Sequence, residues 1–552
     1  MVLSGSLAGV SRFVRRGRSA SGAVTVQVVE KRGSRVISVE HVGSANTDAD
    51  LAVLLERAER LLHPDQEVLD LGELGRSASM ESVADWRQDD APRSDVESTR
   101  TRGRPRSAAG SSGVVVGQPA RILWQVLTEA YARLGFDCLD DDVFMKVVLA
   151  RIVEATSKID ALRVLRNLGV EAPATEKTIY RMLQRVTEGG YRQRLADACF
   201  THASRGGPLT LVMYDATTLH FQAEIDESSL TIEAEPRRVG RSKEHRVDPQ
   251  VQVGLLVDAG GFPLDVYMFP GNAAETKTLI PVVERFLAAH PAVTDLVVVA
   301  DAGLLSAANL NALEDHHLHF IVGSRTSRAP YDLAAYFQAH GNNASDGEVI
   351  ETTRVMGTGK DARERRVVYQ YRFARAKREE RTLGAQVARA QDIAQGRRPM
   401  KKDRFVALSG DRPLVDEKLV ERARQALGFK GYVSNIPTTT MTGEQVIAAY
   451  HDLYQVERSF RMTKGDLAAR PIYLHSEDKI EAHLTTVMAA LAIARDLQDR
   501  TGLTIRAVLH TLEPLRSSRI RFGEQVVEFP PQTTPQQQKL LTTLGVQHPT
   551  GH

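Results

Sequence analysis

The sequence predicts an α/β protein built around a mixed sheet. Three apolar or alternating segments, Leu209–Tyr214, Gln250–Asp258 and Pro263–Phe269, are typical of strands, and a double glycine between the last two is typical of a hairpin turn. A helix is expected over Ala274–His290, and a buried strand over Leu296–Ala300. Antiparallel strands followed by helix and strand indicate a sheet with both parallel and antiparallel neighbours.

Length and composition limit the class of protein. A chain of 552 residues predicts two or three domains, and its 42% hydrophobic and 25% charged residues are ordinary for a soluble globular protein. The formal net charge of +2 means that any affinity for nucleic acid must come from local basic patches. Two cysteines exclude a disulfide framework. No run of 18 apolar residues is present, so we expect a cytoplasmic protein with no membrane partner.

The chain before the sheet divides into three segments. Residues 1–74 combine a basic arm with a β-hairpin over residues 22–44 and a helix that Asp48 or Asp50 would cap. Residues 75–118, rich in Ser, Arg and Asp, predict a flexible linker. Residues 119–205 predict short helices, which suit either a DNA-binding helix-turn-helix-like domain or a domain that serves packing alone.

The chain after residue 206 also divides into segments. The predicted sheet begins within residues 206–323, and a polar, mixed tract follows over residues 324–435. Its many Lys and Arg residues with interleaved aromatic residues predict either a DNA-backbone surface or merely an exposed, charged subdomain. Residues 436–510 predict helices, and the tail over residues 511–552, rich in Gln, Thr and Pro towards its end, is expected to be loosely ordered.

One amphipathic helix is expected from Gly443 to Gly465. Tyr450, Glu457 and Lys464 are seven residues apart, so they lie along one line beside its apolar seam. By itself, this pattern is compatible with a surface glutamate that has ordinary solvated neighbours.

Two further carboxylates follow apolar strands. Asp215 comes directly after LTLVMY and Asp301 directly after LVVVA, and strand ends of this kind gather catalytic groups in α/β sheets. Together with Glu457 they form a candidate carboxylate triad. Three oxygen ligands suit Mg2+, and two such ions would stabilise the attacking and leaving oxygens of a phosphoryl transfer.

Four blocks of sequence, in order, carry a resemblance to a known family. The chain resembles a DDE-type insertion-sequence transposase, of the branch with a Tyr-Arg-Glu-Lys signature around the catalytic glutamate. The blocks are YDATTLHFQ, RSKEHRVDPQVQVGLLVDAGGFPLDVYMFPGNAAETKTL, VVVADAGLLSAANLNALE and YHDLYQVERSFRMTKGDLAARPIYL.

The resemblance implies a ribonuclease-H-like mixed sheet flanked by helices. The catalytic core would comprise residues 206–323 and 436–510, interrupted by a largely β insertion over residues 324–435. The helical domain and a small N-terminal β-hairpin module would precede this core. Asp215, Asp301 and Glu457 would be its catalytic, metal-binding acids.

The resemblance also implies which residues bind DNA. Tyr450 and Lys464 match the first and last letters of the signature, whereas Leu453 stands where the family has Arg, and Arg458 or Arg461 could substitute for it. The basic loop with Arg241, Lys243 and Arg246 is a further candidate for phosphate contact.

The implied activity is metal-dependent cleavage of element ends and strand transfer into target DNA. Two Mg2+ ions, or Mn2+ in their place, would serve as cofactors. The partner would be double-stranded DNA from the element ends and the target, bound by a homodimer associated with the nucleoid. The alternatives are a decayed or domesticated copy that only binds DNA, for which Leu453 argues, and a metal-dependent nuclease of the same fold.

Overall fold

The computed structural model describes most of the chain, in two compact units, Met1–Ala108 and Ala109–His552. The described residues are 10–18, 24–32, 35–45, 54, 58, 113–170, 175–222, 236–240, 248–324, 331–340, 344–399, 403–409, 412–474 and 476–546. Among them, no helix combines the length and apolar character needed to cross a membrane.

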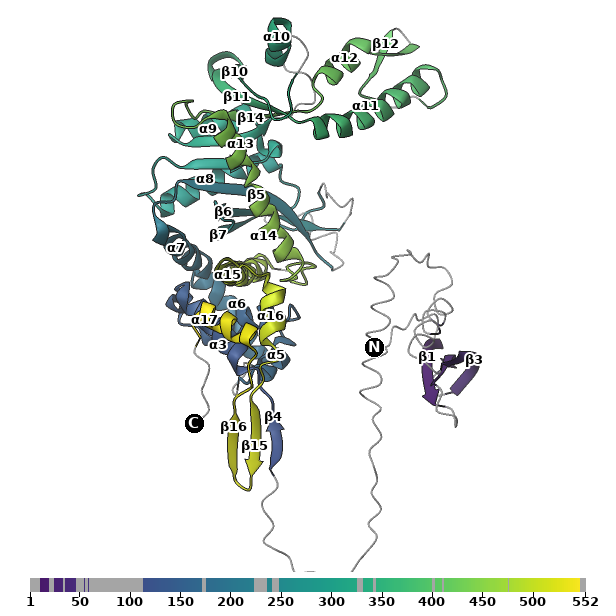
Figure 1. Cartoon of the computed structure of the whole chain (residues 1–552), viewed down its shortest axis with the longest axis vertical. Helices are drawn as coiled ribbons and strands as arrows, with labels where there is room; N and C mark the ends of the chain where they lie inside the picture. Colours follow the sequence, from purple (N-terminus) through teal and green to yellow (C-terminus); the bar gives the residue numbers. More distant parts are fainter. Residues whose placement is uncertain are drawn as a thin grey trace, which may run out of the picture. The chain divides into compact units, whose positions relative to one another are not determined.

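The first unit contains a three-stranded antiparallel sheet (Figure 1). The predicted hairpin is confirmed as β2 (Val24–Arg32) and β3 (Arg35–Ala45). Within the predicted basic arm, Val10–Arg18 form strand β1 beside β2. Across this pair of strands, Arg15 donates to Gln27 at 2.7 Å. The helix expected after Asp48 lies almost wholly outside the described residues.

The second unit is organised around an eight-stranded mixed sheet, in the order β10-β11-β14-β9-β8-β5-β6-β7. Strand β8 pairs in parallel with β5 and β9, and the other neighbours are antiparallel. The strands are β5 (Leu211–His220), β6 (Gln250–Asp258), β7 (Pro263–Pro270), β8 (Val297–Ala300), β9 (His319–Ser324), β10 (Val349–Met356), β11 (Arg363–Tyr371) and β14 (Phe429–Ser434). The mixed α/β class predicted from the sequence is therefore confirmed.

Helices cover both faces of this sheet, because successive side chains of each strand point to opposite sides. Val212 and Tyr214 of β5 pack with α8 (Leu279–Ala289), α9 (Ala307–Asp315) and α10 (Tyr331–His340). Met213 and Leu219 of the same strand share the other core with α13 (Gly443–His451), α14 (Tyr454–Lys464) and α15 (Glu477–Thr501).

Helix α15 is the centre of that second core, since every residue from Ala482 to Gln498 is buried. The helices predicted within 119–205 pack around it and share its core with the sheet (Figure 1). They are α3 (Arg121–Arg133), α4 (Asp142–Val153), α5 (Ala161–Asn167), α6 (Glu176–Glu188) and α7 (Tyr191–Ala203). The helical region is thus continuous with the sheet in a single core.

The expectation of a largely β insertion over residues 324–435 is wrong. Three of its strands, β10, β11 and β14, extend the main sheet, and its longest element is the 22-residue helix α11 (Phe373–Ala394). The part outside the sheet packs α11 against α12 (Glu417–Gln425) and the hairpin β12 (Val406–Ser409) and β13 (Arg412–Val415). Helix-forming Ala, Arg, Glu and Gln dominate α11, which explains its helical state.

The linker and tail are more ordered than expected. Val114–Gly117, inside the predicted linker, form strand β4, which pairs with β15 (Ser518–Phe522) of a hairpin completed by β16 (Gln525–Phe529). After α16 (Ile505–Leu512) and this hairpin, α17 (Pro535–Leu544) begins with a Thr534 capping box and ends at a left-handed Gly545. Its apolar side chains reach the core around α15.

We expect Leu541→Ala to destabilise the second unit by about 2–5 kcal/mol, because Leu541 is buried in that core and the substitution leaves a cavity. Urea unfolding followed by circular dichroism measures the change. The matched control is Lys539→Ala on the exposed side of the same helix, which should change the stability by less than about 0.5 kcal/mol. Equal midpoints for the two variants would contradict the packing of α17.

Candidate active site

Backbone pairing brings Asp215 and Asp301 side by side. The parallel ladder between β5 and β8 ends with Tyr214 opposite Ala300, and the two aspartates are the next residues on each strand. Tyr214 and Ala300 point into the α8–α9 core, so the alternation of side chains directs both carboxylates to the face covered by α13 and α14. Asp215 is half-buried and Asp301 is exposed.

The prediction that Asp215 ends its strand is wrong. Strand β5 continues to His220, and Asp215 pairs opposite Leu255 of β6 in its middle. Only the pairing with the shorter β8 stops there. The Asp215 carboxylate accepts a hydrogen bond from the Ala216 amide at 2.8 Å.

The single helix expected over Gly443–Gly465 is two helices, α13 and α14, separated at Asp452 and Leu453. The backbone tightens there, since the amides of Leu453 and Gln455 donate to carbonyls three residues earlier. Leu453 packs in the core at the junction. Tyr450 therefore lies on one helix, and Glu457 and Lys464 lie on the next.

Tyr450 reaches Asp301 directly. Its buried hydroxyl donates to Asp301 Oδ1 at 2.9 Å, and burial, followed by the charge of Asp301, raises the pKa of Tyr450. Gly323 of β9 makes room for this ring, because a Cβ on Gly323 would lie 2.5 Å from the Tyr450 hydroxyl. Tyr450, the first residue of the signature, thus holds the carboxylate of Asp301 in place by a hydrogen bond.

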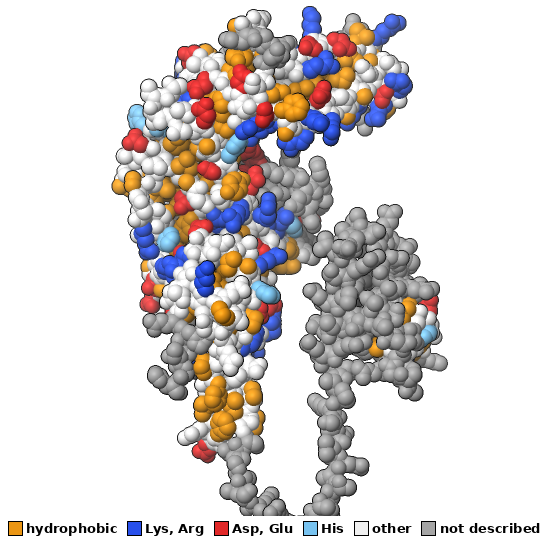
Figure 2. Space-filling view, viewed as in Figure 1, with side chains coloured by type: hydrophobic (Ala, Val, Ile, Leu, Met, Phe, Trp, Pro, Cys, Tyr) orange, Lys and Arg blue, Asp and Glu red, His pale blue; other side chains and the backbone are white. Residues whose placement is uncertain are grey.

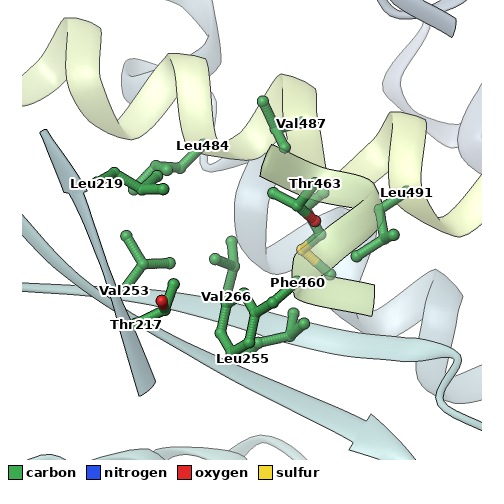
Figure 3. Close-up of a pocket in the computed structure, with 11 residues that line it drawn as sticks. Thr217, Leu219, Val253, Leu255, Val266, Phe460, Thr463, Leu484, Val487 and Leu491 are labelled. Carbon is green, nitrogen blue, oxygen red and sulfur yellow. The ribbon is translucent and has the colours of Figure 1, made fainter. Parts of the chain in front are cut away.

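Lys464 anchors the other end of α14 to the strand that carries Asp215. Its ammonium donates to the Thr217 hydroxyl at 2.5 Å, two residues beyond Asp215 on the same face of β5. Behind this contact lies a cavity of about 20 Å³, lined by side chains of β5–β7, α14 and α15 (Figure 3). Its walls are apolar except for Thr217 and Thr463, so it does not suit a charged substrate.

Glu457 is exposed on α14. Its charge and that of Asp301 both act on Tyr450 and on Lys430. As the side chains stand, however, no three His, Cys, Asp or Glu residues in the described part of the chain converge closely enough to hold a metal ion.

The donor chemistry of the three acids fits a hard divalent cation, since Asp215, Asp301 and Glu457 offer only carboxylate oxygens. Two of them are held by neighbours, through the Ala216 amide and the Tyr450 hydroxyl. Glu457, exposed on its helix, is the acid whose side chain is least constrained by packing.

Sequence reasoning missed Lys430. Its ammonium lies 4.4 Å from the centre of the Tyr450 ring and 5.5 Å from that of Tyr432, both within the range of cation–π contacts. Burial lowers the pKa of Lys430, whereas the charges of Asp301 and Glu457 oppose that shift. No motif marks this lysine in the sequence, because its place beside the acids results from the pairing of β14 with β9.

Glu275 adds a further carboxylate beside Asp301. A Cβ on Gly303 would lie 2.7 Å from Glu275 Oε2 and 4.0 Å from Asp301 Oδ2, so both carboxylates flank this glycine.

The remaining candidate DNA-binding residues are separated by the structure. Arg461 is exposed one helical turn after Glu457, on the same face of α14. Arg458 lies near α15 instead, where its charge acts on Arg495 and Asp499. Arg241, Lys243 and Arg246 lie outside the described residues.

Comparison with known proteins identifies a family. Residues 208–493, more than half of the chain, match the family described as "Transposase DDE domain". No curated protein matches the chain.

Two solved structures are similar at low identity. One, titled "Mos1 transposase paired-end complex with left transposon end", is 14% identical over 50% of this chain and 78% of that chain. The other, titled "Crystal structure of the Mos1 mariner paired end complex with Mn", is 15% identical over 49% and 72%. Both have a TM-score of 0.15, which is too low to support any structural argument.

We expect Gly323→Ala to destabilise the protein by about 1–3 kcal/mol, because the added methyl group overlaps the Tyr450 ring. In the double variant Gly323→Ala/Tyr450→Ala, the destabilisation caused by Gly323→Ala should be mostly absent, because the ring is gone. Urea unfolding of the unmodified protein, the two single variants and the double variant measures this. Gly384→Ala is the control, because nothing lies within 4 Å of its added Cβ on α11. Additive effects of Gly323→Ala and Tyr450→Ala would contradict the contact.

Proposed function

Because this chain belongs to the transposase DDE domain family, we propose that it is the transposase of an insertion sequence, which cleaves the ends of its element and joins them to target DNA. The observation that carries this proposal is the register of β5 and β8, which sets Asp215 beside Asp301 on one face of the sheet. The family match covers both strands and α14.

The order of the central strands supports a ribonuclease-H-like core. Strands β5, β6 and β7 form an antiparallel meander, and β8 and β9 extend it in parallel on the other side of β5. A core of this type would place its acids where the parallel pairing ends. Tyr450, Glu457 and Lys464 match three letters of the signature of the proposed branch, and Leu453 fills a core position where the signature has Arg.

In this proposal Asp215, Asp301 and Glu457 would hold Mg2+ or Mn2+. Two ions bound there would activate the attacking water and stabilise the leaving oxygen of the phosphodiester. Tyr450 would keep the Asp301 carboxylate in place by its hydrogen bond. Lys464, bound to Thr217, would fix α14 and hence Glu457 against the strand that carries Asp215.

The reaction would proceed by two phosphoryl transfers in one site. Water attacks the phosphodiester at the element end and releases a 3′ hydroxyl. That hydroxyl then attacks a target phosphodiester, so each step exchanges one phosphorus–oxygen bond for another. Arg461, on the Glu457 face of α14, and Lys430 would supply positive charge to the phosphate being attacked.

Basic side chains of the 324–435 segment support double-stranded DNA as the partner. Figure 2 shows Lys and Arg side chains gathered along the side of α11 that faces the rest of the unit. The charges of Arg372 and Arg375, at the start of α11, act on Tyr432 and His451, next to Lys430. This arrangement suits DNA that runs from the insertion onto the acid site. The homodimer is proposed only from the resemblance.

We expect Asp215→Asn, Asp301→Asn and Glu457→Gln each to lower end cleavage and joining at least about 1000-fold, because each removes a charged metal ligand. The assay follows labelled element-end duplexes with Mg2+ or Mn2+. Binding of the same duplex, measured by anisotropy in Ca2+, should survive in all three variants. Glu421→Gln, an exposed acid on α12, is the matched control and should keep full activity.

The outcomes separate the competing functions. End cleavage and joining that survive the substitution of any one acid would contradict the assignment of Asp215, Asp301 and Glu457 as the catalytic triad. Cleavage without joining would favour a nuclease of the same fold, and binding without cleavage by the unmodified protein would favour a decayed or domesticated copy. Light scattering of the DNA complex tests the homodimer, and one protein chain per DNA end pair would contradict it.

A further inference from the structure

A second site lies apart from the acids, in a cleft of about 560 Å³. One wall is the connection between α4 and α5, residues 155–159, with Tyr180 of α6. The other wall is the segment 468–474, which follows α14. The volume is in the range of small-ligand sites.

The cleft is lined by cations and not by acids. Arg151, Lys158 and Arg470 contribute to its walls, and none of the described lining residues is Asp or Glu. His483 also lines the cleft, but burial lowers its pKa well below the usual value and disfavours its charged form. The two acids nearest to Lys158 in sequence, Glu154 and Asp160, are both held by Arg163. Among the described lining residues, the positive charges of Arg151 and Lys158 are therefore not accompanied by a carboxylate.

Two of these basic residues build the wall itself. Arg151 donates to the Leu467 carbonyl at 2.8 Å, and His483 Nε2 lies 3.0 Å from the Ala469 carbonyl. The buried His483 Nδ1 has no hydrogen-bond partner among the described residues. These contacts fix the segment after α14, and Lys158 remains as a cation with no ion pair or hydrogen bond recorded to any described residue.

The electrostatics of the cleft agree with this arrangement. Burial, reinforced by the charge of Arg151, lowers the pKa of Lys158 to about 8, and burial lowers the pKa of Arg151 to about 10. An anion in the cleft would offset both effects, because it would attract each of the two cations.

Two aromatic side chains, Tyr180 and Tyr473, line the rim of the cleft. Tyr180 is 49% exposed and Tyr473 is 64% exposed, unusually high fractions for large side chains next to a cleft. Aromatic rings beside cations pack against bases that are not paired in a duplex, so these two rings suit an unpaired nucleotide and not the backbone phosphate itself.

The cleft is linked to the acid site through β5. Ile472 pairs with Phe221, directly after β5, and its amide donates to the His220 carbonyl at 3.0 Å. Phe221 is six residues beyond Asp215, a distance of about 20 Å along an extended strand. The other wall begins just after the helix that carries Glu457.

We propose that this cleft binds a backbone phosphate of the element-end DNA, with Lys158 and Arg470 as its charged contacts, and so positions the duplex about 20 Å from the acids. The inference rests on the proposed function for the identity of the DNA. The recognised chemistry is a phosphate group, and inorganic phosphate is the other source that the experiment separates.

The test compares Lys158→Met with Lys158→Arg in the full-length protein. Anisotropy of a labelled duplex with the element's terminal repeat, in Ca2+ and at several KCl concentrations, gives the affinity and its salt dependence. We expect Lys158→Met to weaken binding about 3- to 10-fold and to reduce the salt slope by about 0.9, the value for one lost phosphate contact. Lys158→Arg should restore both. Lys539→Met, which removes an equal charge from exposed α17, should change neither.

Further measurements make every outcome decisive. Equal melting temperatures for the variants exclude misfolding. If only the binding of inorganic phosphate, measured by calorimetry, depends on Lys158, the cleft is a phosphate site but not a DNA site. If neither ligand responds, the inference is overturned. If the unmodified protein joins DNA ends and the Lys158→Met variant binds DNA with unchanged affinity, the cleft proposal is rejected and the transposase proposal stands. If DNA binding depends on Lys158 but the unmodified protein does not cleave, the transposase reaction is rejected and the cleft proposal stands.

Discussion

The parallel pairing of β5 with β8 is the interaction on which the acid site depends. Backbone hydrogen bonds set the register, so Asp215 and Asp301 become neighbours at the end of the ladder. Because the ladder stops at Tyr214 and Ala300, the next peptide groups of β8 turn away and leave the two carboxylates accessible. The third acid is positioned differently, since Glu457 depends on how α14 packs against β5 and α15.

That packing depends in turn on α15, whose buried polar residues join several elements. Asp496 accepts a charged hydrogen bond from Arg133 of α3 at 2.6 Å, and Arg495 donates to the Gly260 carbonyl between β6 and β7. Beside α15, Arg192 of α7 binds Asp265 of β7 at 2.9 Å. Breaking a buried pair by removing one partner leaves an uncompensated charge, at a cost of about 3–5 kcal/mol. These pairs therefore fix the helical region to the sheet, and the two form one structural body around the site.

Much of the fold could be predicted, because strands and helices with a strong local pattern need little tertiary information. Strand β6 has the predicted bounds, and β8 begins one residue later than predicted. The errors occur where local signals conflict with distant partners: Val114–Gly117 form a strand only because β15 lies beside them. The capping box at Thr534 and the glycine after α17 are sequence signals of a helix. The Gln-, Thr- and Pro-rich composition of the tail predicted a loosely ordered segment instead.

The candidate site likewise contains residues that could be predicted from the sequence and residues that could not. Asp215, Asp301, Glu457 and Tyr450 could be identified from motif and resemblance, and the structure brings Tyr450 to Asp301. The break at Leu453 was not predictable from periodicity, since α13 and α14 keep their apolar faces on the same core. Lys430 and the basic cleft could not be found from sequence, because residues far apart in the chain form both.

The pairing of β4 with the C-terminal hairpin has a consequence for biosynthesis. The contact between Arg516 and Gln118 spans 398 positions, and the core around α15 draws on residues from Ala120 to Val546. A growing chain therefore exposes the apolar faces of α3 to α7 until α17 has been translated. Contacts of such high sequence separation form slowly, so the nascent second unit is a natural client for chaperones that shield apolar surface.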